Sequence, residues 1–191
     1  MNQDNANKVV LLGASGVGKT SIVLQLKEKV FRGMVAPTVG SGVIFKNIET
    51  DKGVIPLKIW DTAGEERYRS FSGLYSQSAT AGIFVFDLTD RRTFDTIDEW
   101  IEEFQKNANA DALLYLAGNK LDLMDQRDVP FDTAFAFSQN RHMKYFEVSA
   151  KTGEGVELLF TELAKQLGPP NDCSSSSIQP KEPGTRSGCC F

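Results

Sequence analysis

An apolar run, a glycine-rich loop and a Lys-Thr pair follow one another near the start of the chain. Residues 8–21 have the sequence KVVLLGASGVGKTS, in which Gly13 to Thr20 match the pattern GxxxxGK[ST]. Val9–Leu12 are predicted as a buried strand and Thr20–Val30 as a helix, which is the setting that this pattern requires. Loop glycines let backbone N–H groups turn toward phosphate oxygens, and the helix N-terminus faces the same anion. The sequence therefore predicts a polyphosphate site between the first strand and the first helix.

The same pattern assigns roles to single residues of this loop. Lys19 is expected to reach the outer phosphates, and the Thr20 hydroxyl to bind magnesium. The other residues expected to contact the nucleotide here are Ser15, Gly16, Val17, Gly18 and Ser21. A glycine turn that only joins a strand to a helix is the alternative explanation.

Composition allows one globular domain and excludes several classes of protein. The chain has 191 residues and 41% hydrophobic content, enough for one substantial core. A net charge of −4 without a basic block argues against nucleic-acid binding. The three cysteines, Cys173, Cys189 and Cys190, form neither a disulfide framework nor a metal-ligand spacing. No apolar run approaches the roughly 18 residues of a membrane span.

Short apolar runs alternate with amphipathic stretches, which predicts an α/β fold. Val43–Ile48 and Val54–Trp60 are predicted as an antiparallel pair of strands joined by a turn at 50–53. Further strands are predicted at 81–87, 112–119 and 143–149, and helices at 92–107, 131–141 and 155–167. This order predicts a mostly parallel six-stranded sheet with helices on both faces and one antiparallel edge hairpin.

Residues 1–168 are expected to form this domain. Residues 169–191 contain almost no core-forming side chains and are predicted to be a disordered tether. Ligands of such sheets bind at the carboxyl ends of the strands. The loop GASGVGKT, Asp61, Asn119 and Ser149 each follow a predicted strand, so they are expected to meet in one site.

The segment GNKLDL, with Asn119, Lys120 and Asp122, predicts which base is bound. Two oxygens of Asp122 can accept hydrogen bonds from the ring N1–H and the exocyclic amine of guanine. Adenine lacks this donor pair and would leave the desolvated carboxylate unpaired. Sites built in this way discriminate by about 10⁴ or more. A solvated loop of mixed charge is the alternative.

Two further segments support a guanine site. In Ser149-Ala150-Lys151 a backbone N–H is placed to meet the guanine carbonyl oxygen. Phe31, seven residues before Thr38, is expected either to cover the edge of the base or to be an ordinary core aromatic residue.

In this order, GASGVGKT, Thr38, WDTAG, NKLD and SAK resemble the Ras-like small GTPases over the whole globular part. Trp60 before DTAG, GEERYRSF after it and the Cys-Cys pair near the carboxyl terminus are similar to the Rab family. There is no Rho-type insertion and no Arf-type N-terminal helix. The segments SIVLQL and AGNKLDL, together with the final Cys-Cys-X arrangement, are most similar to the early-endosomal branch.

The resemblance implies a switch that binds GTP or GDP with Mg²⁺. In it Thr20 and Thr38 bind the metal, Asp61 holds it through water, and the Gly64 N–H meets the γ-phosphate. Loss of that phosphate would release the segments 33–45 and 62–78 from an ordered to a mobile state. Effectors that bind the ordered form would report GTP.

By the same resemblance Lys19, Thr38, Gly64 and the residue after DTAG carry hydrolysis. The family usually has Gln there to orient the attacking water, whereas this chain has Glu65. An ionised carboxylate only accepts hydrogen bonds, so Glu65 either acts as a base or repels the γ-phosphate. Alternatively, Glu66 or a partner's arginine supplies the missing function. The rival hypothesis is a GTP-loaded scaffold with little hydrolysis; an ATP-dependent kinase is disfavoured by NKLD.

The resemblance also implies an effector surface at Val43, Trp60 and Tyr75. Rab proteins usually carry Phe where this chain has Val43, so a hydrophobic patch of altered shape is expected. Ordinary core positions are the alternative for Trp60 and Tyr75.

The carboxyl terminus carries Cys189-Cys190-Phe191, and Gly188 excludes a CaaX box. The Cys pair resembles the Rab signal for two geranylgeranyl groups, and two adjacent lipids anchor a protein stably where one does not. The expected partners are effectors, an exchange factor, a GTPase-activating protein, a GDP-dissociation inhibitor and the Rab escort protein with its prenyltransferase. The expected place is the cytoplasmic face of endosomal or other vesicle membranes, with the protein a monomer.

Overall fold

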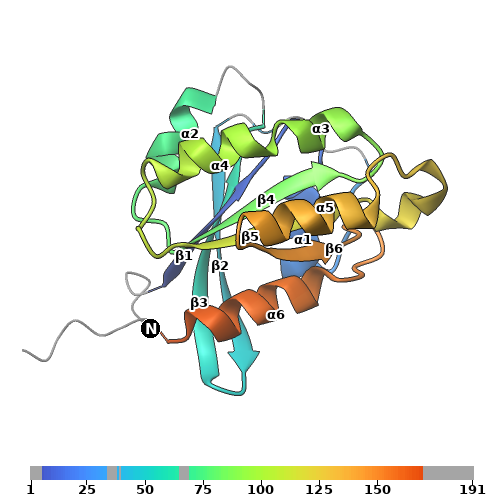
Figure 1. Ribbon diagram of the computed structural model, residues 1–191. Coiled ribbons are helices and arrows are strands. Elements are labelled where there is room, and N and C mark those ends of the chain that lie inside the picture. The colour runs from blue at the N-terminus through green and yellow to red at the C-terminus, as the bar shows by residue number, and fades with distance from the viewer. Residues whose placement is uncertain (1–5, 34–37, 39, 65–68, 170–191) are drawn as a thin grey trace, which may run out of the picture.

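A six-stranded sheet lies between two layers of helices in the computed structural model, which describes residues 6–33, 38, 40–64 and 69–169 (Figure 1). The strand order is β2-β3-β1-β4-β5-β6. Strand β2 is antiparallel to β3, and the other neighbours are parallel. The strands are β1 (Asn7–Leu12), β2 (Ser41–Thr50), β3 (Gly53–Thr62), β4 (Ala81–Asp87), β5 (Leu113–Asn119) and β6 (Lys144–Glu147). The predicted fold class, including the antiparallel hairpin at one edge, is confirmed.

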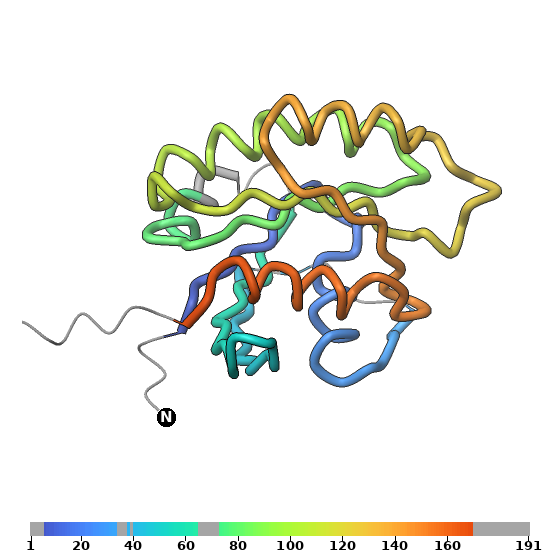
Figure 2. The backbone as a smooth tube through the Cα atoms, turned by 60° about the horizontal axis from the view of Figure 1, so that its bottom comes forward, coloured from blue at the N-terminus to red at the C-terminus, as the bar shows by residue number. Residues whose placement is uncertain are grey.

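The helices divide between the two faces of the sheet (Figure 2). One face is covered by α1 (Lys19–Glu28) and α6 (Val156–Leu167). The other is covered by α2 (Arg69–Ser76), α3 (Arg91–Asp95), α4 (Ile97–Gln105) and α5 (Phe131–Asn140). A 3₁₀ segment, η3 (Leu121–Gln126), follows β5. None of the helices in the described ranges is long and apolar enough to cross a membrane.

Strand β4 explains why the sheet is covered on both sides. All seven of its residues are buried, and successive side chains of a strand point to opposite faces. Ile83 and Val85 pack in the core beneath α1 and α6, whereas Phe84 and Phe86 pack beneath α3 and α4. A continuous apolar run such as AGIFVFD is therefore stable only as a central strand of a parallel sheet.

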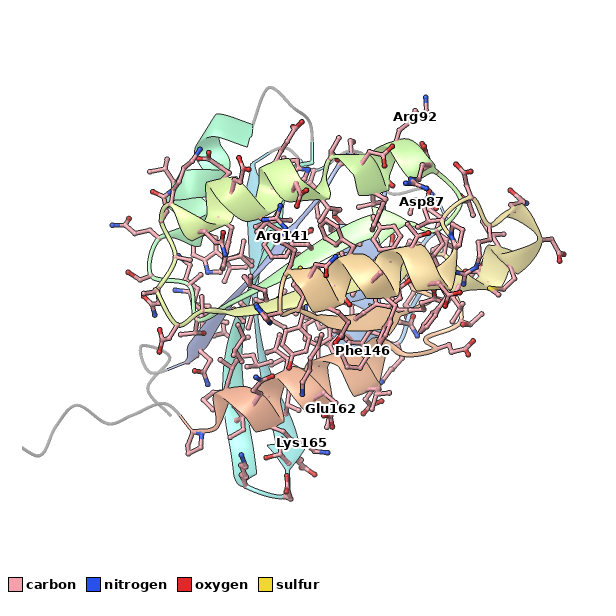
Figure 3. All side chains as sticks on the ribbon, viewed as in Figure 1. Asp87, Arg92, Arg141, Phe146, Glu162 and Lys165 are labelled. Atoms are coloured by element: carbon pink, nitrogen blue, oxygen red, sulfur yellow. The ribbon has the colours of Figure 1, made fainter. Side chains whose placement is uncertain are left out.

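At the far edge of the sheet, β6 is held by aromatic contacts. Phe146 lies between α5 and α6 (Figure 3) and stacks on Tyr115 of β5 with ring centroids 6.0 Å apart. The nearby pair of Glu162 and Lys165 on α6, 3.0 Å apart, is partly exposed. Both residues of that pair lie within α6, and this edge is held by the pairing of β6 with β5 and by the aromatic packing.

Several predicted boundaries differ from the structure. The predicted helix 92–107 is two helices, α3 and α4, which meet at Thr96. The Thr96 hydroxyl donates to the Thr93 carbonyl oxygen, 3.1 Å away, and such local bonds compete with the helical ladder. Helix α1 ends at Glu28 rather than residue 30 because Lys29 adopts the left-handed conformation, with φ of 56°.

Two elements were missed altogether, namely α2 and η3. Both are shorter than the window of about 11 residues over which helical periodicity becomes visible in a sequence. The predicted strand 143–149 forms pairs only over residues 144–147. Of the predicted tether, residues 170–191 lie outside the described residues, so the tether stays a prediction.

Replacing Phe104 by Ala should lower the free energy of unfolding by about 3–5 kcal/mol, because a large cavity would remain in the core. Phe104 is completely buried, and its ring meets that of Phe84 edge-on at 5.6 Å. Urea denaturation followed by circular dichroism measures the loss. The control Leu158→Ala, at a position 57% exposed on α6, should change the value by less than about 0.5 kcal/mol. Equal losses in both variants would contradict the core position of Phe104.

Candidate functional site

A cavity of about 440 Å³ lies where the loops after β1, β3, β5 and β6 come together. The predicted site residues that line it are Ser15, Gly16, Gly18, Lys19, Thr20, Ser21, Phe31, Thr38, Gly64, Asn119, Lys120, Asp122, Ala150 and Lys151. They come from both ends of the chain, as expected for the carboxyl edge of a mostly parallel sheet. Phe31 is 40% exposed and lines the cavity, so it is not an ordinary core aromatic residue.

Three predicted residues, Val17, Asp61 and Ser149, do not line the cavity, and three lining residues were missed. The side chain of Val17 packs in the core, and Ser149 is completely buried. Gly33, Thr62 and Leu123 line the cavity as well. Thr62 belongs to DTAG and Leu123 to NKLDL, so the position of each within a motif was the only signal available in the sequence.

The loop before α1 requires glycine at position 18. Gly18 has a φ of 96°, and a Cβ atom there would collide with the side-chain amide of Asn119. This close approach lets the Asn119 amide nitrogen donate to the Val17 carbonyl oxygen, 2.8 Å away. The loop of residues 13–18, called the phosphate loop below, is thereby attached to the end of β5.

Lys19 is buried beside this loop. Its ammonium group donates to the carbonyl oxygens of Gly13, at 2.7 Å, and Ala14, at 2.9 Å. Burial lowers the pKa of Lys19 to about 8, although the nearby Asp61 carboxylate raises it. A desolvated ammonium of this kind is strongly stabilised by an anion.

Three oxygen-bearing side chains converge next to Lys19. The Thr20 hydroxyl oxygen lies 2.8 Å from that of Thr38 and donates to the Asp61 Oδ2 atom, 2.7 Å away. Among the residues that the structure describes, the other oxygen of Asp61 is buried and has no hydrogen-bond partner. Burial raises the pKa of Asp61, while Thr20 and Lys19 oppose the increase.

This oxygen set suits a hard cation. Mg²⁺ prefers oxygen ligands and typically combines one or two protein groups with phosphate oxygens and water. The unpartnered Asp61 oxygen is the acceptor that such an ion or its water would use. Within the described ranges no group of three His, Cys, Asp or Glu side chains could hold a metal. The predicted ligands Thr20, Thr38 and Asp61 are brought together.

The opposite end of the cavity is built from the loops after β5 and β6. The Ser149 hydroxyl donates to Asp122 Oδ1 at 2.6 Å, and Lys151 Nζ lies 3.4 Å from Asp122 Oδ2. Burial raises the pKa of Asp122, but the bonds from Ser149 and Lys151 outweigh it and hold the pKa below its usual range. An ionised acceptor is thus fixed at the position predicted for guanine.

A surface cluster of Val43, Phe45, Trp60 and Tyr75 lies outside the cavity. Val43 pairs with Trp60 across β2 and β3, and the rings of Trp60 and Tyr75 are 5.9 Å apart. Val43 and Phe45 are 38% and 44% exposed. Trp60 and Tyr75 are half-buried against the core, so they join core and surface. Phe45 was missed, although it lies two residues from Val43 on the same face.

Three predicted residues cannot be placed. Glu65, Cys189 and Cys190 lie outside the described residues. Their roles in hydrolysis and lipid attachment stay predictions.

Comparison with known proteins identifies the class that this fold and site define. The model of the Ras family matches residues 8–168. The chain belongs to this family of small GTPases, whose members bind and hydrolyse GTP, generally with Mg²⁺.

Similarity to individual proteins gives the particular branch. The chain is 35% identical to the Ras-related protein RABF2a of Arabidopsis thaliana over 194 residues, covering 99% of this chain and 97% of the relative. It is 39% identical to RabJ of Dictyostelium discoideum, covering 84% and 63%, and 40% identical to Rab-26 of Bos taurus, covering 86% and 64%. The aligned region thus spans less than two thirds of RabJ and Rab-26. The chain is a Rab-family GTPase, a class of GTP-binding switch in membrane traffic.

The variant Asp122→Asn should change the preferred base from guanine to xanthine. An amide donates to the C2 carbonyl of xanthine, whereas it offers one fewer acceptor to guanine. We expect GDP affinity to fall at least about 100-fold, and xanthosine diphosphate to bind more tightly than GDP. Displacement of a fluorescent nucleotide measures both affinities. The control Asp125→Asn, at an exposed position of η3, should keep the guanine preference, and a guanine preference in both variants would refute the role of Asp122.

Proposed function

We propose that this chain is a magnesium-dependent GTP switch that recruits effectors on the cytoplasmic face of endosomal or other vesicle membranes. One observation carries the proposal: a single cavity is lined by Lys19, Thr20, Thr38 and Asp122. Asp61 accepts a hydrogen bond from the Thr20 hydroxyl, which also lies 2.8 Å from that of Thr38. The Lys19 cation matches the phosphates of a guanosine polyphosphate, the oxygen set matches the magnesium ion that the phosphates carry, and the Asp122 carboxylate matches the base.

Each group then has a defined task. Lys19 offsets the negative charge of the outer phosphates, and its burial strengthens that interaction. Thr20, Thr38 and Asp61 would hold Mg²⁺, which supplies neutralisation of charge on the phosphate oxygens. Asp122 orients the base at the other end.

Switching follows from where two of these residues lie. Thr38 comes just before β2, and Gly64 just after β3. A Cβ atom on Gly64 would collide with Lys19 Nζ and the Ala14 carbonyl, so its backbone passes close to the phosphate loop. When the γ-phosphate leaves, contacts to Thr38 and Gly64 would be lost together, which changes the chain on either side of the β2–β3 hairpin.

Effectors would then bind the surface cluster of Val43, Phe45, Trp60 and Tyr75. The cluster is apolar, partly exposed and continuous with β2 and β3. Its aromatic residues are of the kind that dominates binding energy at interfaces. Because Val43 replaces the usual Phe, we expect its effectors to differ from those of other Rab proteins.

Glu65 decides between a cycling switch and a GTP-loaded scaffold. We expect the native chain to release phosphate in a single turnover with Mg²⁺, at a rate within about tenfold of that of Glu65→Gln, which corresponds to about 1.4 kcal/mol in the barrier. Chelation of Mg²⁺ should abolish the reaction in both proteins. The variant Glu66→Gln tests the alternative in which Glu66 supplies the missing function, and it should behave as the native chain. If the native chain stays GTP-bound while Glu65→Gln turns over, the scaffold replaces the switch.

Membrane attachment would depend on both terminal cysteines, since one lipid gives only marginal binding and two anchor stably. In cells, the double variant Cys189→Ser/Cys190→Ser should move from the membrane fraction to the soluble fraction. Each single variant should divide between the two fractions. The control Cys173→Ser should remain with membranes, and a membrane-bound double variant would disprove anchoring through this pair.

A further inference from the structure

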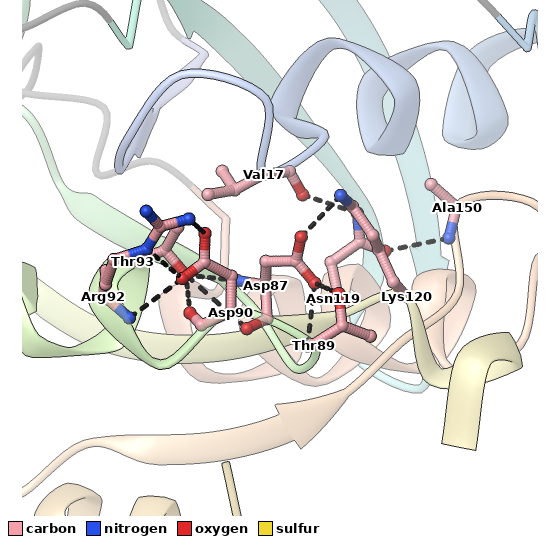
Figure 4. Close-up of polar contacts among 9 residues, drawn as sticks. All are labelled: Val17, Asp87, Thr89, Asp90, Arg92, Thr93, Asn119, Lys120 and Ala150. Atoms are coloured by element: carbon pink, nitrogen blue, oxygen red, sulfur yellow. Dashed lines mark hydrogen bonds and ion pairs between the residues drawn. The ribbon is translucent and has the colours of Figure 1, made fainter. Parts of the chain in front are cut away.

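We propose that Asp87 is a positioning residue of the guanine-binding end, and that it acts by holding the side chain of Lys120 (Figure 4). The inference rests on the proposed function, because it concerns how firmly that site retains its nucleotide. Asp87 does not line the cavity. Its effect must therefore pass through the residue it holds.

The pairing of β4 with β5 places Asp87 beside residues 119–122, the segment predicted to bind guanine. Asp87 ends β4 and pairs with Asn119, which ends β5. The next backbone N–H, that of Leu88, donates to the Asn119 carbonyl oxygen at 3.0 Å. This pairing places the Asp87 carboxylate beside residue 120 although 33 positions separate the two in the chain.

Both oxygens of the Asp87 carboxylate have partners. Oδ1 accepts from the Thr89 backbone N–H at 2.9 Å and from the Thr89 hydroxyl at 2.7 Å. Oδ2 lies 2.5 Å from the ammonium nitrogen of Lys120. The Asp87 side chain is 8% exposed and that of Lys120 is 34% exposed. Thr89 fixes the orientation of the carboxylate, and the charge of the carboxylate is directed to Lys120.

Lys120 needs such support because its backbone is unusual. It has a φ of 70° and a ψ of 36°, the left-handed conformation that non-glycine residues rarely adopt. Such residues persist where their surroundings fix them, and they concentrate at functional sites. Lys120 lies between Asn119 and Asp122 and lines the cavity. Fixing the end of its side chain also restricts the alkyl stem, and with it whatever part Lys120 contributes to the wall.

A neighbouring ion pair is far more exposed. Arg92 and Asp90 are 2.8 Å apart, but the Arg92 side chain is 90% exposed. Arg92 lies at the outer surface of α3, near Asp87 in the view of Figure 3. Pairs as exposed as this one contribute little, so Asp90 provides a matched control a few residues from Asp87.

The substitution Asp87→Asn tests the proposal with the least change of shape. The Asn carbonyl oxygen can still accept both bonds from Thr89, but its amide group would present N–H donors to an ammonium that has only donors. Lys120 should then leave its position. We expect the dissociation rate of a fluorescent GDP analogue to rise about tenfold, the loss typical of one charge-assisted hydrogen bond. Asp90→Asn should leave the rate within about twofold of native, since Asn also caps helices well.

A double-mutant cycle separates positioning from a merely structural role. Lys120→Met keeps most of the alkyl stem and removes the ammonium. If Asp87 acts through Lys120, Asp87→Asn should have almost no further effect on nucleotide dissociation in the Lys120→Met background. The same fold increase in both backgrounds would overturn the proposal.

Two measurements keep the result clear. Thermal melting in excess GDP shows whether Asp87→Asn folds. If it does not fold, Thr89→Val is used in its place. This variant removes one donor to the carboxylate and should raise the dissociation rate by a smaller factor. An unchanged rate in a folded Asp87→Asn or Thr89→Val variant would also refute the role of Asp87. A native chain that fails to bind the GDP analogue would refute the proposed function itself, which is a different outcome.

Discussion

The buried side chain of Asn119 holds the site together, and the arrangement of every other group depends on it. Its amide nitrogen donates to the Val17 carbonyl oxygen in the phosphate loop, and its amide oxygen accepts from the Ala150 backbone N–H at 3.0 Å. Three loops that lie far apart in sequence are thus joined by one residue that is 2% exposed. Removing either partner would leave a buried polar group unsatisfied, at a cost of about 1–3 kcal/mol.

These loops meet in one place because the side chains of the central strand β4 pack alternately into the cores on the two faces of the sheet. Ile83 and Val85 of β4 face one helical layer, and Phe84 and Phe86 face the other. A shift of the register by one residue would exchange the two sets of side chains. The packing therefore fixes where β4 and β5 end, and with them the relative positions of Asp87 and Asn119.

Much of the fold and most of the site could be predicted from sequence, because local patterns carried them. Alternating apolar runs located the strands, and motif spacing located Lys19, Asp61 and Asp122. What escaped prediction depends on contacts distant in sequence. Nothing local distinguishes Val17, which faces the core, from the loop residues beside it. The ion pair of Asp87 and Lys120 likewise exists only through the register of β4 and β5.

Strand β3 has consecutive residues with opposite surroundings, since Trp60 belongs to the surface cluster and the buried Asp61 accepts from Thr20 of the site. One peptide unit separates the two. Thermodynamic linkage then makes any coupling between them reciprocal: a protein that binds the Trp60 surface more tightly when Asp61 is engaged must strengthen the engagement of Asp61 by the same factor. An effector that binds in this way would therefore also tighten the binding of the nucleotide that recruited it, and so favour its own retention.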